Sequence, residues 1–193
     1  MYDIVFISYN EALADHNFKL LCDRFPIAQR VNGVKGIHKA HIEAAEVSMT
    51  KMFWVVDADA QIVKDFNFDY KVDQYNLDTV HVWQSLNPIN DLQYGYGGVK
   101  LLPKQLTLDM DTTTTDMTTS ISKNFKAIKQ VSNITAFNSD PFSAWKSAFR
   151  ECVKLSSKVI DRQQDNETEQ RLDIWCSKGA DRPYGDFAIE GAK

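Results

Sequence analysis

The sequence predicts an α/β protein with a mostly parallel, Rossmann-like sheet flanked by helices, and two observations carry this prediction. Short apolar runs of strand length, of which DIVFIS and FWVV are the clearest, lack the polar alternation of a half-exposed sheet. Such runs are typical of strands that are buried on both faces. Between them lie segments with apolar residues at helical spacing, and alternating strands and helices with short connections build a parallel sheet.

Residues 1–60 contain the strongest part of this pattern. A strand from Asp3 to Tyr9 leads into a helix that ends before Pro26, and a second short strand ends at the turn NGVKG. The next helix, over 37–52, has small residues in the middle of its apolar stripe, which allow a helix to approach a sheet closely. The run FWVV then completes a βαβαβ unit, for which right-handed crossovers predict parallel strands.

The signals for strands after residue 60 are weaker. The runs TVHVWQSL, GGVKLL and SNITAF have the length and apolar content of strands, and Pro103 ends the second of them. Residues 107–122 are rich in Thr and Asp and show little periodicity, so we expect an exposed loop there.

Two helices are predicted near the end of the sequence. Asp140 before Pro141 is a strong helix start, with the aspartate as N-cap and the proline at the first helical position. The apolar face of this helix is predicted to contain Phe142, Trp145, Phe149, Cys152, Val153, Ser156 and Ile160. A second helix is expected over 165–176. The final segment, YGDFAIEGAK, predicts the start of a helix that would continue beyond Lys193.

The composition indicates a folded protein with no overall attraction to nucleic acid. The chain has 193 residues, 44% of them apolar, and a formal net charge of −4, which leaves room only for a local basic patch. Its three cysteines are widely spaced and lack zinc-site spacing, as expected for reduced thiols. The N-terminus has neither the basic flank nor the apolar run of a secretory signal, and no membrane-spanning run occurs, so we expect a soluble, cytoplasmic protein.

Two Asp-x-Asp triplets occur, at 57–59 and at 109–111. The proportion of Asp in the chain predicts about two such triplets by chance, so the triplet alone carries no information. Asp109 and Asp111 lie in the Thr-rich segment, where solvated carboxylates are expected. Asp57 and Asp59, in contrast, follow a predicted buried strand, and open α/β sheets bind ligands beyond the carboxyl ends of their strands.

Two carboxylates at positions i and i+2, where a strand opens into a turn, project to one side and repel each other. A hard divalent cation relieves this repulsion, and Mg²⁺ or Mn²⁺ typically completes its shell with water and substrate phosphates. We therefore predict that Asp57 and Asp59 hold Mn²⁺ or Mg²⁺, the alternative being the polar end of an ordinary strand. Competing nucleotide motifs are missing, because no GxGxxG follows the first strand and no GxxxxGK[ST] occurs.

Around these aspartates the first 60 residues resemble the GT-A fold of nucleotide-sugar glycosyltransferases, including short phage-encoded transferases. The similar features are ISYNEA at the end of the first strand, the turn and helix RVNGVKGIHKAHIEAA, and the strand that leads into DADA. The segment YGYGGVKL and the helix after Asp140 fit more loosely. The resemblance implies one GT-A-like domain over 1–193, with a nucleotide-sugar-binding part over 1–103 and an acceptor-side part over 104–193.

The resemblance also implies a donor site. Asp59 would bind the metal that bridges the donor's diphosphate, and Asp57 would contact the metal or the ribose. The base and ribose pocket would be lined by Ser8, Tyr9, Asn10 and Glu11. The base or phosphates would be approached by Arg30, Asn32 and Lys35, and the donor sugar by the backbone of Gly97 and Gly98.

The implied reaction is transfer of a hexosyl or pentosyl group, with the metal stabilising the leaving diphosphate as a Lewis acid. An inverting enzyme also needs a carboxylate base for the acceptor hydroxyl. Asp140 stands late in the chain, where such enzymes often have this base, although a plain N-cap is the alternative. Many members also supply a late histidine or a second acid to the metal, whereas the four histidines here, His16, His38, His41 and His81, lie in the first half of the chain.

The predicted helix after Asp140 also contains a basic ridge. The ridge consists of Lys146, Arg150, Lys154 and Lys158, at every fourth position of the Asp140 helix. It is either a solvated face or a contact for an anionic acceptor such as nucleic acid.

Two functions other than glycosyl transfer are alternatives. The enzyme alternative is a nucleotidyltransferase, which usually needs a Gly-rich, Lys- or Arg-bearing loop after the first strand, where this chain has SYNEALADH. The other alternative is a non-catalytic nucleotide-sugar-binding module of the same fold.

Overall fold

The structure, a computed structural model, describes residues 1–95, 97–114, 116–157 and 164–193. The chain folds into two compact units. Unit 1 comprises residues 1–85 and 94–134, and unit 2 comprises residues 86–93 and 135–193. The boundary predicted from the sequence, between 1–103 and 104–193, differs from the boundary between these units, because residues 104–134 belong to unit 1.

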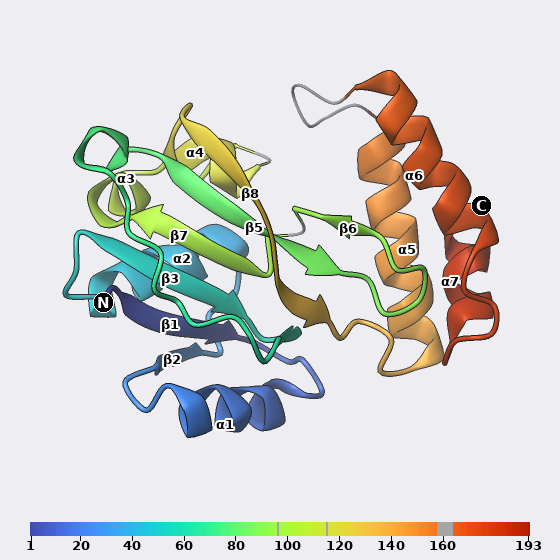
Figure 1. The fold of residues 1–193 in the computed structure, drawn as a ribbon, viewed down its shortest axis with the longest axis horizontal. Coiled ribbons are helices and arrows are strands. Elements are labelled where there is room, and N and C mark those ends of the chain that lie inside the picture. Colours follow the sequence, from blue (N-terminus) through green and yellow to red (C-terminus); the bar gives the residue numbers. More distant parts are fainter. Residues whose placement is uncertain (96, 115, 158–163) are drawn as a thin grey trace. The chain divides into compact units, whose positions relative to one another are not determined.

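Unit 1 is built on a mixed sheet with helices on both faces (Figure 1). Its strands are β1 (Asp3–Ser8), β2 (Gln29–Asn32), β3 (Met52–Asp57), β4 (Ala60–Ile62), β5 (Val80–Leu86), β6 (Gln93–Tyr94), β7 (Val99–Pro103) and β8 (Phe125–Thr135). The strand order is β2-β1-β3-β7-β5-β8-β4, with β6 paired to β5. Its helices are α1 (Ala14–Arg24), α2 (Ile37–Val47), α3 (Lys104–Leu108) and α4 (Met117–Ile121), and a 3₁₀ turn, η1, spans Gln74–Asn76.

The predicted βαβαβ unit is confirmed. The central strand β1 pairs in parallel with β2 on one side and with β3 on the other, so that Val5 lies between Gln29 and Val55. Beyond β3 the sheet continues antiparallel, because β7 runs opposite to both β3 and β5. The described residues of the connection between β5 and β7 contain no crossover helix, as antiparallel neighbours permit. The mostly parallel sheet is thus confirmed over β2, β1 and β3, and the sheet as a whole is mixed.

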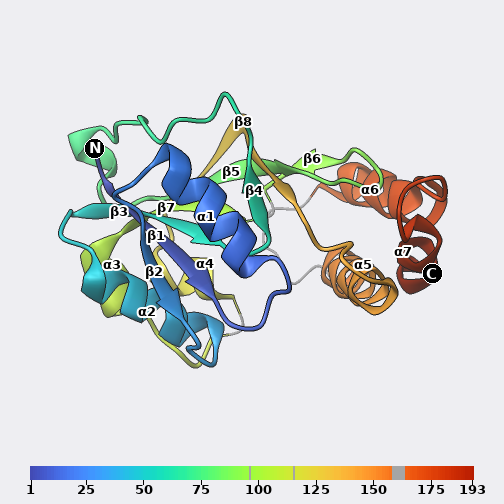
Figure 2. The ribbon, with the colours of Figure 1, turned by 90° about the horizontal axis from the view of Figure 1, so that it is seen from below.

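Alternate residues of β1 and β3 point to opposite faces of the sheet, of which one is covered by α1 and the other by α2 together with α3 and α4 (Figure 2). Ile4 and Trp54 pack with Leu21 of α1, while Val5 and Val55 pack on the other face with α2. The small residues of α2 that face the sheet are Ala40, Ala44 and Ala45. The chain runs from β1 to β2 over one face and returns past β1 to β3 over the other, so the strand order reverses between β1 and β3, which is where α/β sheets bind ligands.

The segment predicted as an exposed loop, 107–122, contains the end of α3 and all of α4. Met110, Met117 and Ile121 are buried on the α2 side of the sheet. Asp116 caps α4 by accepting a hydrogen bond from the backbone N–H of Thr118 at 2.9 Å. The prediction was wrong because the Thr and Asp residues form caps and turns around three apolar anchors. Thr115 lies outside the described residues, and Asp109 and Asp111 are exposed, as expected.

Unit 2 contains α5 (Pro141–Ser156), α6 (Asp165–Ser177) and α7 (Gly185–Ala192), which confirms the predicted helices. The predicted apolar face of α5 is wrong in most positions, because the helix buries Ala144, Ala148, Cys152 and Leu155. Phe142, Phe149 and Val153 are exposed, and Ile160 lies outside the described residues. Close packing explains the change. A Cβ atom at Gly191 of α7 would lie 2.3 Å from the carbonyl oxygen of Trp145, so small residues line this contact. No described helix is long and apolar enough to cross a membrane.

Candidate functional site

Three of the predicted site residues end neighbouring strands at one edge of the unit 1 sheet. Ser8 ends β1 and lies opposite Asn32, the last residue of β2. Asp57 ends β3 and lies opposite Ile7, one residue before Ser8. Because parallel strands place their carboxyl ends together, these three residues lie at the same edge of the sheet, where the strand order reverses between β1 and β3.

Ser8, Arg30 and Asn32 form a hydrogen-bonded group at this edge. The Ser8 hydroxyl donates to Oδ1 of Asn32 at 2.7 Å, and Nε of Arg30 donates to Oγ of Ser8 at 2.9 Å. The guanidinium also pairs with the exposed carboxylate of Asp15 at 2.7 Å and lies 5.4 Å from the centre of the Phe18 ring. These contacts fix a positive charge beside the ends of β1 and β2.

The loop that follows β1 exposes the remaining polar residues predicted for the pocket. Tyr9, Asn10 and Glu11 are all exposed, and a carboxylate oxygen of Glu11 accepts a hydrogen bond from the Tyr9 N–H at 2.7 Å. Lys35, in the turn before α2, is also exposed. These side chains are therefore accessible to a ligand at the sheet edge.

Asp57 forms an ion pair with Lys100, a site residue that was not predicted from the sequence. Nζ of Lys100 lies 2.8 Å and 3.0 Å from the two carboxylate oxygens of Asp57, and it also donates to the carbonyl oxygen of Gly97 at 2.5 Å. The Lys100 side chain is only 3% exposed, whereas that of Asp57 is 28% exposed. Burial raises the pKa of Asp57, and the charge of Lys100 opposes this increase.

Asp59 has a different environment from Asp57. Within the described part of the chain its carboxylate has no salt-bridge partner. Burial, followed by the negative charge of Asp57, raises the pKa of Asp59 to about 7; the charge of Lys100 opposes this increase only in part, and the charge of Glu11 adds to it. Removal of a carboxyl from water disfavours its ionised form, and neighbouring carboxylates strengthen this effect. Asp59 is therefore a poorly compensated carboxylate at the sheet edge.

These carboxylates fit a divalent ion that is completed by other ligands. The described residues contain no group of three or more His, Cys, Asp or Glu side chains that could enclose a metal. Asp57 and Asp59 could nevertheless hold Mg²⁺ or Mn²⁺, which commonly bind one or two carboxylates together with water and substrate phosphates. The unpaired carboxylate of Asp59 is the first candidate ligand, since both oxygens of Asp57 already accept hydrogen bonds from Lys100.

A buried asparagine holds the turn between the two aspartates. Nδ2 of Asn17, on α1, donates to the carbonyl oxygen of Ala58 at 2.8 Å. Asn17 is 3% exposed, and its Oδ1 has no hydrogen-bond partner among the described residues. Since Ala58 separates Asp57 from Asp59, Asn17 contributes to the position of both carboxylates.

Gly97 and Gly98 lie beside Asp57, where each has a structural reason to be glycine. Gly97 has a φ of 78°, in the region that favours glycine. Gly98 accepts a backbone hydrogen bond from Asp57 at 2.9 Å, and a Cβ on it would lie 2.8 Å from Nδ2 of the buried Asn133. The structure thus requires Gly98 for packing, whereas contact of either glycine with a donor sugar stays a prediction.

His41 lies under the site on α2. It is fully buried, and its Nδ1 lies 2.8 Å from the carbonyl oxygen of Ile37. Burial, followed by the charge of Lys100, lowers the pKa of His41 well below its usual value. The burial and lowered pKa of His41 favour a neutral, packed histidine, and the charge of Lys100 contributes to this shift.

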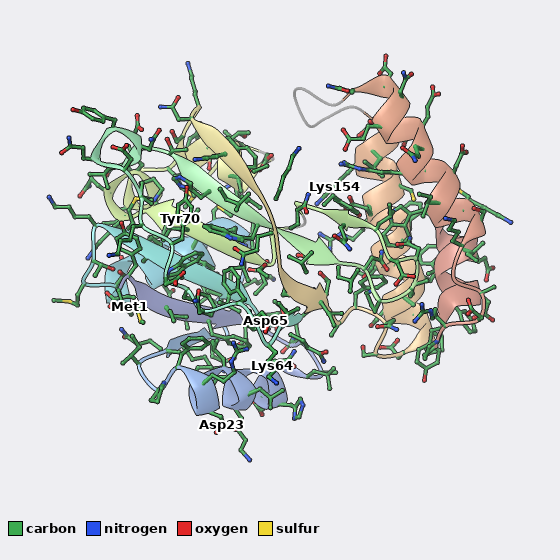
Figure 3. The ribbon with its side chains drawn as sticks, viewed as in Figure 1. Met1, Asp23, Lys64, Asp65, Tyr70 and Lys154 are labelled. Atoms are coloured by element: carbon green, nitrogen blue, oxygen red, sulfur yellow. The ribbon has the colours of Figure 1, made fainter. Side chains whose placement is uncertain are left out.

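Asp140 and the basic ridge belong to unit 2. Asp140 acts as N-cap of α5, because it accepts hydrogen bonds from the N–H of Ser143 at 2.9 Å and from its hydroxyl at 2.6 Å. The hydroxyl and N–H of Ser143 lower the pKa of Asp140. Lys146, Arg150 and Lys154 are exposed on α5 (Figure 3 labels Lys154), and Lys158 lies outside the described residues. A catalytic role of Asp140 and an acceptor contact through the ridge stay predictions.

The two residues missed from the sequence each had a weak signal. Lys100 is the one charged residue in the otherwise apolar strand VKLLP. Asn17 occupies a position on α1 that shares the buried face of Ala14 and Leu21. In both cases a polar residue interrupts an apolar pattern, and only the tertiary structure reveals its partner.

Comparisons with known proteins add little to this geometry. No protein-family model matches the chain, and a search of curated proteins finds no match. A structure of HddC from Yersinia pseudotuberculosis is 17% identical and covers 69% of each chain with a TM-score of 0.37. A structure of HddC complexed with GMP-PN is 13% identical and covers 70% of this chain and 91% of that one, with a TM-score of 0.36. Similarities this weak give no information about function.

Proposed function

We propose that this chain is a metal-dependent glycosyltransferase that moves a sugar from a nucleotide-sugar donor to an acceptor. The observation that supports the proposal most is the position of Asp57 and Asp59. Asp57 ends β3 and Asp59 follows two residues later, next to the carboxyl end of β1, at the point where the strand order reverses. In the triplet at 109–111, which composition alone also allows, Asp109 and Asp111 are exposed between two short helices.

Each residue of the site has a proposed task. Asp59 would bind Mn²⁺ or Mg²⁺, and Asp57 would contact the metal or the ribose. When bound, the metal would stabilise the leaving diphosphate as a Lewis acid. Arg30, held beside Ser8 and Asn32, and the exposed Lys35 would add positive charge for the phosphates.

The pocket for the base and ribose would lie at the loop after β1. Tyr9 offers a ring that is 47% exposed, and Asn10 and Glu11 offer polar groups for hydrogen bonds. Gly97 and Gly98 would allow the donor sugar to approach the backbone beside Asp57.

The acceptor side of the proposal rests on unit 2. Asp140 would act as the base for the acceptor hydroxyl in an inverting reaction, and because the hydrogen bonds from Ser143 lower its pKa, this role would require the acceptor to displace them. The exposed cations of α5 alternate with exposed rings, and Nζ of Lys146 lies 5.8 Å from the centre of the Phe142 ring. An anionic acceptor such as nucleic acid would fit this combination of charges and rings.

A donor screen tests the proposed reaction. The protein is incubated with Mn²⁺ and a panel of uridine, guanosine, cytidine and thymidine diphosphate sugars, and release of the nucleoside diphosphate is measured. We expect release from one donor class, with loss of release in Asp59→Asn. A parallel panel of nucleoside triphosphates with sugar 1-phosphates, assayed for pyrophosphate, covers the nucleotidyltransferase. Binding of a donor without turnover in either panel would favour the non-catalytic module.

A further inference from the structure

Lys100 lies in a layer of unit 1 that is otherwise apolar. It is paired with Val55 of β3 and with Val82 of β5, and the next residue on the same face of β7, Leu102, belongs to the core beneath α2. Burial of an ammonium group in such a layer is costly unless the charge is paired and hydrogen-bonded. The contacts of Lys100 with Asp57 and Gly97 meet both conditions.

These contacts use the whole hydrogen-bonding capacity of the ammonium. Its three N–H groups have three acceptors, namely the two oxygens of Asp57 and the carbonyl oxygen of Gly97. Lys100 therefore lies directly in front of the carboxylate of Asp57. A divalent ion that also binds Asp57 would face this positive charge at close range, which is unfavourable in a partly buried site.

We propose that in the metal-free protein the Lys100 ammonium binds the Asp57 carboxylate in place of a metal ion, and that a divalent ion gains Asp57 as a ligand by displacing this ammonium. The identity of the metal site rests on the proposed function. The flexible stem of a lysine allows the ammonium to leave one partner for another. Lys100 thus weakens the affinity for the metal and keeps the sheet edge electrostatically balanced without it.

Metal binding to Lys100→Met tests this inference. Free Mn²⁺ is measured by electron paramagnetic resonance during titration of the purified full chain, without donor or acceptor. We expect roughly tenfold or tighter Mn²⁺ binding in Lys100→Met than in the unmodified protein, because the competing charge is gone. Lys100→Arg keeps the charge and should bind no more tightly than the unmodified protein. Lys51→Met controls for the change in net charge. Lys51 is exposed and lies directly before the first residue of β3, at the end of the strand opposite to Asp57.

A second measurement uses the unmodified protein, in case Lys100→Met does not fold. The Nζ–Hζ signals of Lys100 are followed by NMR while Mg²⁺ is added. We expect them to shift or disappear as the site fills. Unchanged signals at saturation would overturn the inference.

The outcomes separate this inference from the proposed function. Equal Mn²⁺ affinities in the unmodified protein and in a folded Lys100→Met would overturn the competition and leave metal dependence intact. Binding only by Lys100→Met would support the competition and show that the natural chain does not bind the ion without a nucleotide. Absence of binding by both proteins would overturn the competition, and metal dependence with a nucleotide present is measured separately by the calorimetric titration with UDP and GDP.

Discussion

The ammonium nitrogen of Lys100 lies within 3.0 Å of both carboxylate oxygens of Asp57. This pair exists because β7 runs antiparallel to β3 and places Lys100 opposite Val55, two residues before Asp57 on the same face. The long side chain then reaches along the strand to the carboxylate. An antiparallel strand that follows β5 therefore completes a site whose other parts come from parallel strands.

Loss of the Asp59 charge should stabilise the metal-free protein at neutral and alkaline pH. Burial and the charge of Asp57 raise the pKa of Asp59 from 3.8 to about 7. Between these values the folded state binds a proton that the unfolded chain does not, so the free energy of unfolding falls as the pH rises. We expect Asp59→Asn to raise the melting temperature at pH 8 by about 3 °C or more, and by less near pH 4. Circular dichroism melts in EDTA would measure this.

Asp111→Asn is the matched control for this experiment. Asp111 belongs to the second triplet, is exposed, and has its pKa lowered by the hydroxyl and N–H of Thr113. Its replacement should not stabilise the protein at pH 8. A melting temperature of Asp59→Asn at pH 8 that is no higher than that of the unmodified protein would show that the Asp59 charge does not destabilise the fold.

His41 should make the protein sensitive to mild acid. Burial and the charge of Lys100 keep its pKa well below 6.5 in the folded state, whereas the unfolded chain binds a proton near that pH. The free energy of unfolding should therefore fall as the pH drops below about 6.5. We expect His41→Gln to show a smaller fall in melting temperature between pH 7.5 and 5.5. His16→Gln, at an exposed histidine, should retain the full fall, and equal slopes in all three proteins would disprove this role.

Gly98 should be the least replaceable glycine near the site. A Cβ at this position would lie 2.8 Å from Nδ2 of Asn133, which is fully buried and accepts hydrogen bonds from Ser85 and Ser132. We expect Gly98→Ala to destabilise the protein by about 1–3 kcal/mol in urea unfolding, as overpacking of a core does. Gly95→Ala, whose Cβ would have only an ordinary contact at 3.7 Å, should be close to neutral. Similar losses in both variants would contradict the close approach of Asn133.

The exposed cations of α5 should bind polyanions if the acceptor is nucleic acid. Replacement of Lys146, Arg150 and Lys154 by Gln should weaken binding to a fluorescent single-stranded oligonucleotide, measured by anisotropy, and reduce its salt dependence. Lys51, Lys71 and Lys123, three exposed lysines of unit 1, provide a control with the same change in charge. Equal binding by the two triple variants would remove the ridge from the acceptor proposal.

The sequence predicted those features that depend on local pattern. The apolar runs of β1 and β3, the small residues of α2 and the cap at Asp140 each reflect a periodicity or a spacing, and each was found. Apolar periodicity was misleading in α5, where the buried face contains Ala144 and Ala148 and the backbone at Trp145 lies close to Gly191.

Contacts between residues far apart in the sequence could not be predicted. Lys100 and Asp57 are 43 positions apart, and Asn17 and Ala58 are 41 apart. Each pairing depends on which strand or helix becomes the neighbour of β3. The aspartates themselves could be predicted, whereas the cation and the amide that hold them could not.

Binding of UDP and GDP to the full chain by isothermal titration calorimetry, with Mn²⁺ and with EDTA, tests the central claim most directly. The proposed site predicts that at least one of the two nucleotides binds in Mn²⁺ and not in EDTA. It also predicts that Asp59→Asn, still folded, loses this binding while Asp111→Asn retains it. Failure of both nucleotides to bind in a metal-dependent way, or undiminished binding in a variant that lacks both Asp57 and Asp59, would contradict the claim.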